Sequence, residues 1–100
     1  SNFKLAGRGA SATGYPDDNG TFVVLKGSRI SSAVTSGLQP SYCAKREELI
    51  KEEVILNSVF IENYTFDSVS AAASVVLGRA SNGRTEWTMI DGRTIAHAGH

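Results

Sequence analysis

An alanine-rich segment with a capping signal at each end constrains the fold of this chain more tightly than any other part of the sequence. Ser68 or Ser70 can accept a hydrogen bond from a free N–H group in the first turn of a helix. Gly78 stands where a left-handed residue commonly follows the last turn. The three alanines at 71–73 add only methyl groups to the backbone, so they make the helix thin. We therefore expect a short helix that packs closely against a sheet or another helix.

A β-hairpin is predicted near the N-terminus. Residues 10–15 are small and moderately β-prone, and residues 21–25 form a strongly β-prone apolar run. Between them, residues 16–20 read Pro-Asp-Asp-Asn-Gly, in which proline presets φ and Asn-Gly accepts positive φ. Successive side chains of a strand point to opposite faces, so residues 22–25 place apolar groups on both. We expect this second strand to be central in its sheet or covered.

A second β-hairpin is predicted at the other end of the chain. Residues 84–90 would pair with residues 93–96 around Asp91-Gly92, a strong two-residue turn signal. Trp87 would anchor one face of this hairpin and Met89 the other.

The middle of the chain predicts a polar loop over residues 31–39, a helix from Ser41 or Tyr42 to about Glu53, and a strand over residues 59–64. One stripe of the helix carries Tyr42, Arg46, Leu49 and Ile50. The elements together predict a small α+β domain. Its order is an N-terminal β-hairpin, a helix, a strand, the short alanine-rich helix and a C-terminal β-hairpin.

Length and composition indicate a single domain over residues 1–100. An apolar content of 41% with 20% charged residues suits a modest core and excludes a disordered chain. No apolar run approaches the ~20 residues that cross a bilayer, so we expect no membrane partner. The single cysteine, Cys43, favours a reducing, cytoplasmic location. The chain lacks an initial Met, so we expect a piece of a longer protein, with Ser1-Asn2 possible cloning residues.

Charge is distributed unevenly along a chain whose formal net charge is zero. Residues 1–46 hold six basic residues against two acidic ones, whereas residues 47–67 hold six acidic residues against one basic. A neutral total can therefore hide one basic face and one acidic face.

The sequence carries no recognisable catalytic or cofactor-binding constellation. It has neither a phosphate-binding loop ending in Lys-Ser/Thr nor a dinucleotide fingerprint. We interpret His97 and His100 as tail residues, not metal ligands, and Cys43 as a half-buried structural thiol. The glutamates at 47, 48, 52 and 53 resemble a solvated helix flank. No catalytic residue, metal or cofactor is predicted.

Three groups of residues are candidates for contacting nucleic acid. The candidate residues are Lys26, Arg29, Ser68, Ser70, Arg79, Asn82 and Arg84. The two serines could hold a phosphate at a helix N-terminus, or they could only cap the helix. The cluster from 79 to 84 could contact phosphates or base edges, or it could be solvated turn residues. The two cations after the apolar strand could join that cluster, or could only protect a sheet edge.

Several segments of the second half carry a family resemblance. These segments are Phe66-Asp67-Ser68-Val69-Ser70-Ala71-Ala72-Ala73, Leu77-Gly78-Arg79, Asn82-Gly83, Trp87 and Asp91-Gly92. The chain resembles the bacterial domain of unknown function numbered four-three-five-seven, and residues 20–28 and 46–50 extend the resemblance over nearly its whole length. Its second half is similar in outline to the restriction-and-modification-associated domain that accompanies adenine methylases.

The resemblance implies an accessory role beside DNA-processing machinery. Members of the family typically lie at the C-terminal end of larger proteins, often behind a GIY-YIG nuclease domain, and no catalytic residues carry over. Three residues depart from the family pattern. Val69 replaces a usual proline at the first helical position. Glu53 replaces a helix-ending glycine, so the first helix is expected to run on. Arg84 replaces an aromatic residue, which would loosen the core or strengthen a basic patch.

We therefore expect a non-catalytic module that helps a nuclease or modification enzyme engage DNA. The alternative is a protein-interaction or oligomerisation module, for which the divided charge and the apolar first hairpin are suitable. The expected partners are DNA, the rest of the parent polypeptide and possible further copies of the chain. A free-standing small enzyme would need a convergent acid, base and nucleophile, which the sequence lacks.

Overall fold

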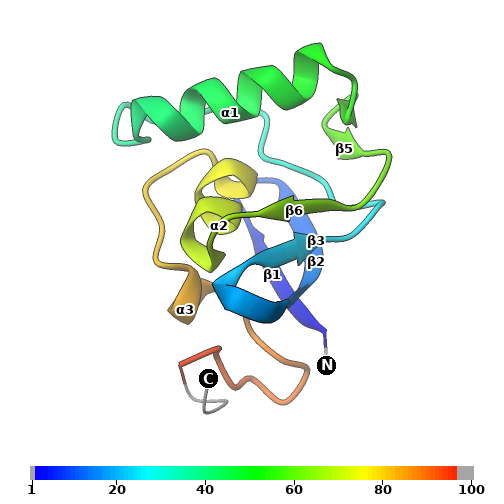
Figure 1. Ribbon diagram of the computed structural model, residues 1–100. Coiled ribbons are helices and arrows are strands. Elements are labelled where there is room, and N and C mark those ends of the chain that lie inside the picture. The colour runs from blue at the N-terminus through cyan, green and yellow to red at the C-terminus, as the bar shows by residue number, and fades with distance from the viewer. Residues whose placement is uncertain (1, 97–100) are drawn as a thin grey trace.

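A four-stranded antiparallel sheet forms the centre of the structure, a computed structural model that describes residues 2–96 (Figure 1). The strands lie in the order β1 (Phe3–Gly7), β2 (Ala10–Pro16), β3 (Phe22–Val24) and β6 (Tyr64–Phe66). The helix α2 (Val69–Leu77) packs on one face of this sheet, and α1 (Pro40–Lys51) packs against α2. The domain has the α+β class that the sequence predicts.

The first hairpin confirms the sequence prediction, and β1 extends it. Strand β2 pairs with β3 across the turn that contains the short 3-10 helix η1 (Asp18–Gly20). Strand β3 lies between β2 and β6, and its side chains are buried on both faces. Strand β1 was not predicted, although Phe3 and Leu5 alternate with exposed residues along it.

Helix α2 begins and ends at the caps that its sequence predicts. Ser68 Oγ accepts a hydrogen bond from Ala71 N at 3.0 Å, and Gly78 adopts a left-handed φ of 73°. The helix contacts all four strands of the sheet, and Ala72 and Ala73 are fully buried. The thin alanine face therefore allows the close approach to the sheet that we expected.

Arg46 joins α1 to the C-terminal end of α2. Its side chain is almost fully buried, with 6% exposure, and it donates hydrogen bonds to Val75 O at 2.7 Å, Ser31 Oγ at 3.3 Å and Ser31 O. Burial lowers the pKa of the guanidinium, but arginine remains charged in proteins. Its positive charge faces the negative end of the α2 dipole, where the last carbonyl groups lack partners within the helix.

The other carbonyl groups at this end of α2 also have donors. Ser31 N donates to Val76 O at 2.8 Å, and Arg8 Nε donates to Leu77 O at 3.0 Å. Two cations and a backbone amide thus satisfy three successive carbonyl groups, so this helix end is fixed to the β1–β2 turn, to α1 and to the loop between β3 and α1.

The predicted strand over residues 59–64 is divided in the structure. Strands β4 (Ile55–Leu56) and β5 (Val59–Phe60) form a separate hairpin, and β6 begins only at Tyr64. The turn between β4 and β5 consists of Asn57 and Ser58, whose φ angles are 53° and 68°. Because these residues accept a left-handed backbone, the apolar residues after α1 turn back on themselves and pair with β5.

Helix α1 does not run on through Glu53, so that expectation is wrong. The helix ends at Lys51, and Glu53 adopts a left-handed φ of 61°. The residue that stands in place of the family's glycine therefore takes the conformation that favours glycine.

The predicted C-terminal strand over residues 84–90 is also wrong. Residues Gly83–Glu86 form a short helix, α3, because Asn82 Oδ1 accepts from Arg84 N at 3.0 Å and Ser70 Oγ accepts from Gly83 N at 2.9 Å. After it, Thr88 makes isolated bridges to Lys4 and Thr94. The reversal at Asp91-Gly92 remains, with φ of 90° at Gly92.

Trp87 lies in the core, fully buried against the ring of Phe22 with 4.4 Å between ring centroids. Its Nε1 donates to Val69 O at 3.2 Å. Trp87 therefore fixes the segment after α3 to the N-terminal end of α2.

Replacing Arg46 by methionine should lower the free energy of unfolding by about 3 kcal/mol, because the buried carbonyl groups of Ser31 and Val75 lose their donors. Urea unfolding followed by the fluorescence of the buried Trp87 measures this change. Lys51→Met, on the exposed side of the same helix, is the matched control and should cost less than about 1 kcal/mol. Equal stabilities of the two variants would contradict the role of Arg46.

Candidate functional site

The structure separates the seven candidate residues into two groups. Lys26 and Arg29 follow the C-terminal end of β3, whereas the other five residues, Ser68, Ser70, Arg79, Asn82 and Arg84, follow β6 along the chain. Because β3 and β6 are antiparallel, with Phe22 opposite Phe66, the segments that leave the two strands depart from opposite ends of the pair. Consistent with this, Lys26 N donates to Asn63 Oδ1 at the start of β6. The seven residues therefore do not form one patch.

The two serines have structural partners. Ser68 Oγ caps α2, and Ser70 Oγ accepts from Gly83 N, where α3 approaches α2 most closely. A Cβ atom at Gly83 would lie 2.1 Å from Val69 O, so only glycine fits this contact. The Ser68 hydroxyl thus caps α2, and the Ser70 hydroxyl joins α2 to α3.

Acidic residues accompany the arginines of the second group. Arg79 forms an ion pair with Glu86 at 3.5 Å. Arg84 lines a surface cavity of about 500 Å³ together with Asp17 and Asp18. Arg79 is therefore paired with a carboxylate and Arg84 shares its cavity with two, which weakens the attraction of this region for phosphate.

The face of the sheet that points away from α2 has a different character. Residues that pair directly across antiparallel strands point to the same face of the sheet. Between β1 and β2, Lys4 pairs with Thr13 and Ala6 pairs with Ser11. Val23 of β3 pairs with Tyr15 of β2 on one side and with Thr65 of β6 on the other. The side chains on the opposite face, among them Phe3, Leu5, Phe22 and Phe66, belong to the core beneath α2.

Arg29 continues this outward face toward the second hairpin. Isolated bridges place Arg29 opposite both Ser11 and Val59, and Val59 pairs with Leu56. We define the outward face by residues on these paired positions: Lys4, Ala6, Ser11, Thr13, Tyr15, Val23, Arg29, Leu56, Val59 and Thr65. It carries two cations and several hydroxyl groups, and none of its positions is a carboxylate.

Sequence reasoning found Arg29 but missed Lys4, Ser11 and Thr13 as members of one surface. The alternation Phe3-Lys4-Leu5 was the available signal for β1, since period-two patterning is typical of a half-buried strand. The bridge from Arg29 to Ser11 joins segments that are far apart in sequence, and no local pattern encodes it.

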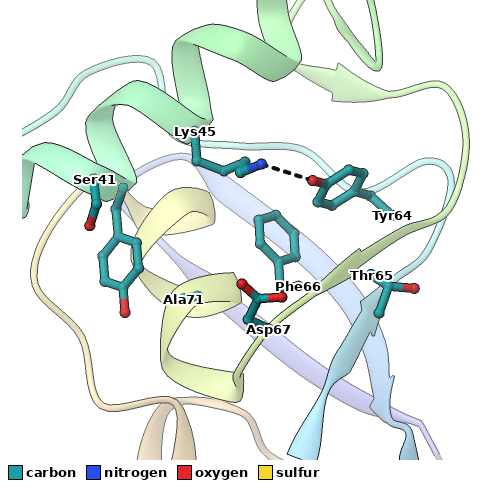
Figure 2. Close-up of a pocket in the computed structure, with 8 residues that line it drawn as sticks. Ser41, Lys45, Tyr64, Thr65, Phe66, Asp67 and Ala71 are labelled. Atoms are coloured by element: carbon teal, nitrogen blue, oxygen red, sulfur yellow. Dashed lines mark hydrogen bonds between the residues drawn. The ribbon is translucent and has the colours of Figure 1, made fainter.

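A pocket of about 250 Å³ lies between α1 and β6 (Figure 2). Its lining residues are Ser41, Tyr42, Lys45, Tyr64, Thr65, Phe66, Asp67 and Ala71. Figure 2 shows the ammonium of Lys45 reaching across from α1 to the Tyr64 hydroxyl, with Phe66 and the Asp67 carboxylate below it. The Tyr64 and Phe66 rings meet edge to face, with 4.8 Å between centroids.

Lys45 is the cation at the rim of this pocket. Its Nζ lies 3.2 Å from Tyr64 Oη, 3.0 Å from a carboxylate oxygen of Glu48 and 5.7 Å from the centroid of the Tyr64 ring. The hydrogen bond with Tyr64, and then that with Glu48, raises the pKa of Lys45. The charged form is thus held in place at neutral pH, and the contact is lost as pH rises through this raised pKa.

The sequence profile of DUF4357, a domain of unknown function, matches residues 3–99. The chain belongs to this family. No curated protein and no solved structure matches it. Membership of this family shows neither an activity nor a ligand.

Among residues 2–96 of this DUF4357 domain, no group of His, Cys, Asp and Glu is placed to hold a metal ion. His97 and His100 lie outside these described residues. Cys43 is free and half-buried. No helix in the described part of the chain has the length and apolar character needed to cross a membrane.

Tyr64→Phe should lower the pKa of Lys45 toward its ordinary value, because the substitution removes the hydroxyl that contributes most to the shift and keeps the ring. An NMR titration of the Lys45 side chain measures this pKa. Tyr42→Phe removes a hydroxyl from the same pocket and should leave it unchanged. A Lys45 pKa that is the same in Tyr64→Phe and in the unmodified protein would show that this hydrogen bond is not the cause.

Proposed function

We propose that this DUF4357 domain is a non-catalytic accessory module that helps a cytoplasmic DNA-processing protein, of nuclease or restriction-modification type, engage DNA. The observation that carries the proposal is the outward face, which presents Lys4 and Arg29 with no carboxylate on the same paired positions. The family resemblance supports it by implying a parent protein that acts on DNA. Arg29 is the one residue of the initially predicted basic patch that belongs to this face.

The chemistry of the face suits the phosphate backbone of DNA. Lysine and arginine contact phosphates as cations, and serine and threonine hydroxyls donate to phosphate oxygens. Lys4 and Arg29 flank β2 from its two sides, at pairing positions that are two residues apart. Strand spacing therefore puts their Cα atoms roughly 12 Å from each other, so they would contact two separate phosphates. A lone aromatic, Tyr15, does not provide the stacking platform that single strands favour.

The expected affinity is modest. A net charge of zero gives no long-range attraction to DNA, and two phosphate contacts release few counterions. A weakly binding module still contributes when it is tethered to a protein that binds the same DNA, because the tether raises its effective concentration. This dependence on a parent protein is what an accessory role means in physical terms.

Fluorescence anisotropy with labelled duplex DNA tests the proposal. We expect micromolar binding at low salt, falling about tenfold between 50 and 200 mM salt, because two phosphate contacts give a logarithmic slope of about −1.8. Arg29→Glu or Lys4→Glu should weaken binding and reduce this slope by about 1.

Lys51→Glu is the matched control, since it makes the same change of charge at an exposed position of α1 that is not part of the outward face. Its affinity should stay within about twofold of the unmodified domain. Equal losses in all three variants would indicate only general electrostatics, and an absence of binding at 50 mM salt would remove the proposal for the isolated domain.

A second candidate function is a protein-interaction module, and the β4–β5 hairpin favours it. Leu56 and Ile61 are each 45% exposed, and Leu56 pairs with Val59 on the face opposite the buried Ile55 and Phe60. Exposed aliphatic residues grouped on one face are typical of interaction surfaces. If DNA binding is absent, a concentration-dependent mass that Leu56→Ser and Ile61→Ser reduce would support this alternative.

A further inference from the structure

We propose that the pocket between α1 and β6 binds a guanidinium group, namely the side chain of an arginine presented by a basic segment of a partner protein. The proposal does not depend on DNA binding, because the pocket shares only Thr65 with the outward face and neither of its two cations. The pocket combines aromatic side chains with a carboxylate. Tyr42, Tyr64 and Phe66 line it together with Asp67.

The Asp67 carboxylate has no ion pair or side-chain hydrogen bond with any of residues 2–96. Figure 2 shows it turned toward Phe66 and the space between α1 and β6. A carboxylate can accept two parallel N–H groups, and it then needs a donor from outside the chain. The free acceptor therefore faces the position that a ligand would occupy.

A guanidinium fits these walls better than other small groups. It is planar, stacks on aromatic rings and donates two parallel hydrogen bonds to one carboxylate. An ammonium could meet the carboxylate but would lack both the stacking surface and the paired donors. A cavity of about 250 Å³ between α1 and β6 has room for this group and for the end of its aliphatic stem.

Lys45 argues against an anion in the same pocket. Its ammonium is already held by Tyr64 Oη and by the Glu48 carboxylate, so an anion would have to displace these partners. The anion would also meet the negative charge of Asp67. The position of Lys45, 5.7 Å from the centroid of the Tyr64 ring, shows that a cation is already held against this wall.

The charge of the segment that leads into the pocket favours a basic partner. Residues 47–67, which run from the second half of α1 through the β4–β5 hairpin to Asp67 just after β6, hold six acidic residues against one basic. This distribution attracts an arginine-bearing segment and repels an acidic one. It also disfavours a second copy of this chain that would dock through the same acidic region.

The test is an NMR titration of the ¹⁵N-labelled protein with N-acetyl-arginine amide. We expect saturable shifts at the amides of Thr65, Phe66, Asp67 and Ala71, with a dissociation constant on the order of millimolar for so small a ligand. N-acetyl-citrulline amide has the same shape without the charge and should bind at least about fivefold more weakly.

Two variants with opposite expected effects make the test specific. Asp67→Asn should weaken arginine binding about fivefold, because the amide keeps the shape but loses the charge. Lys45→Gln should tighten it about twofold, because a like charge at the rim is removed. Asp17→Asn, a carboxylate of the other cavity, should change nothing. The dispersion of the spectra verifies that each variant is folded.

Several outcomes would overturn the proposal. One is the absence of saturable shifts, and another is equal binding of the arginine and citrulline compounds. Binding that Asp67→Asn leaves unchanged would place the ligand elsewhere. Inorganic phosphate is the probe for the opposite chemistry. Saturable phosphate shifts at the same amides that Lys45→Gln abolishes would make the pocket an anion site.

Discussion

The buried guanidinium of Arg46 is the interaction on which the arrangement of the domain depends. It links α1 to the loop at Ser31 and to the carbonyl end of α2, which in turn contacts every strand of the sheet. A buried cation is costly to desolvate, and here carbonyl groups at the negative end of a helix dipole offset that cost. With α2 fixed on one face of the sheet, the exposed side chains of Lys4 and Arg29 belong to the opposite, outward face. With α1 fixed beside β6, the pocket of Figure 2 forms.

Several arginines are held by carbonyl groups or carboxylates, and this explains how a chain with zero net charge can still have a basic face. Arg8 and Arg46 hold the end of α2, and Arg79 and Arg93 are paired with carboxylates. Lys4 and Arg29 lie instead on paired strand positions whose neighbours are hydroxyl-bearing or aliphatic. The acidic excess lies in residues 47–67, from the second half of α1 to just after β6, whereas the two cations of the outward face come from β1 and from the segment after β3.

The sequence correctly predicted the elements that are determined by residues close together along the chain. The caps of α2 at Ser68 and Gly78, the turn before β3 and the burial of Trp87 follow from short-range signals. The errors arose where side chains from distant segments decide the outcome. Ser70 Oγ accepts a hydrogen bond from Gly83 N, and this contact helps residues 83–86 form α3 where a strand was predicted. The sequence showed that Lys26, Arg29, Arg79 and Arg84 were basic, but only the antiparallel register showed that they lie at two ends of a strand pair.

The most direct test of the account is an NMR map of the ¹⁵N-labelled domain titrated with a short DNA duplex at low salt. If the outward face binds DNA, shifts should concentrate at the amides of Lys4, Ser11, Thr13 and Arg29 and should fade as salt is raised. Shifts confined to Ser70, Arg79 and Arg84, or no shifts at all, would contradict the assignment of the outward face as the DNA-binding surface.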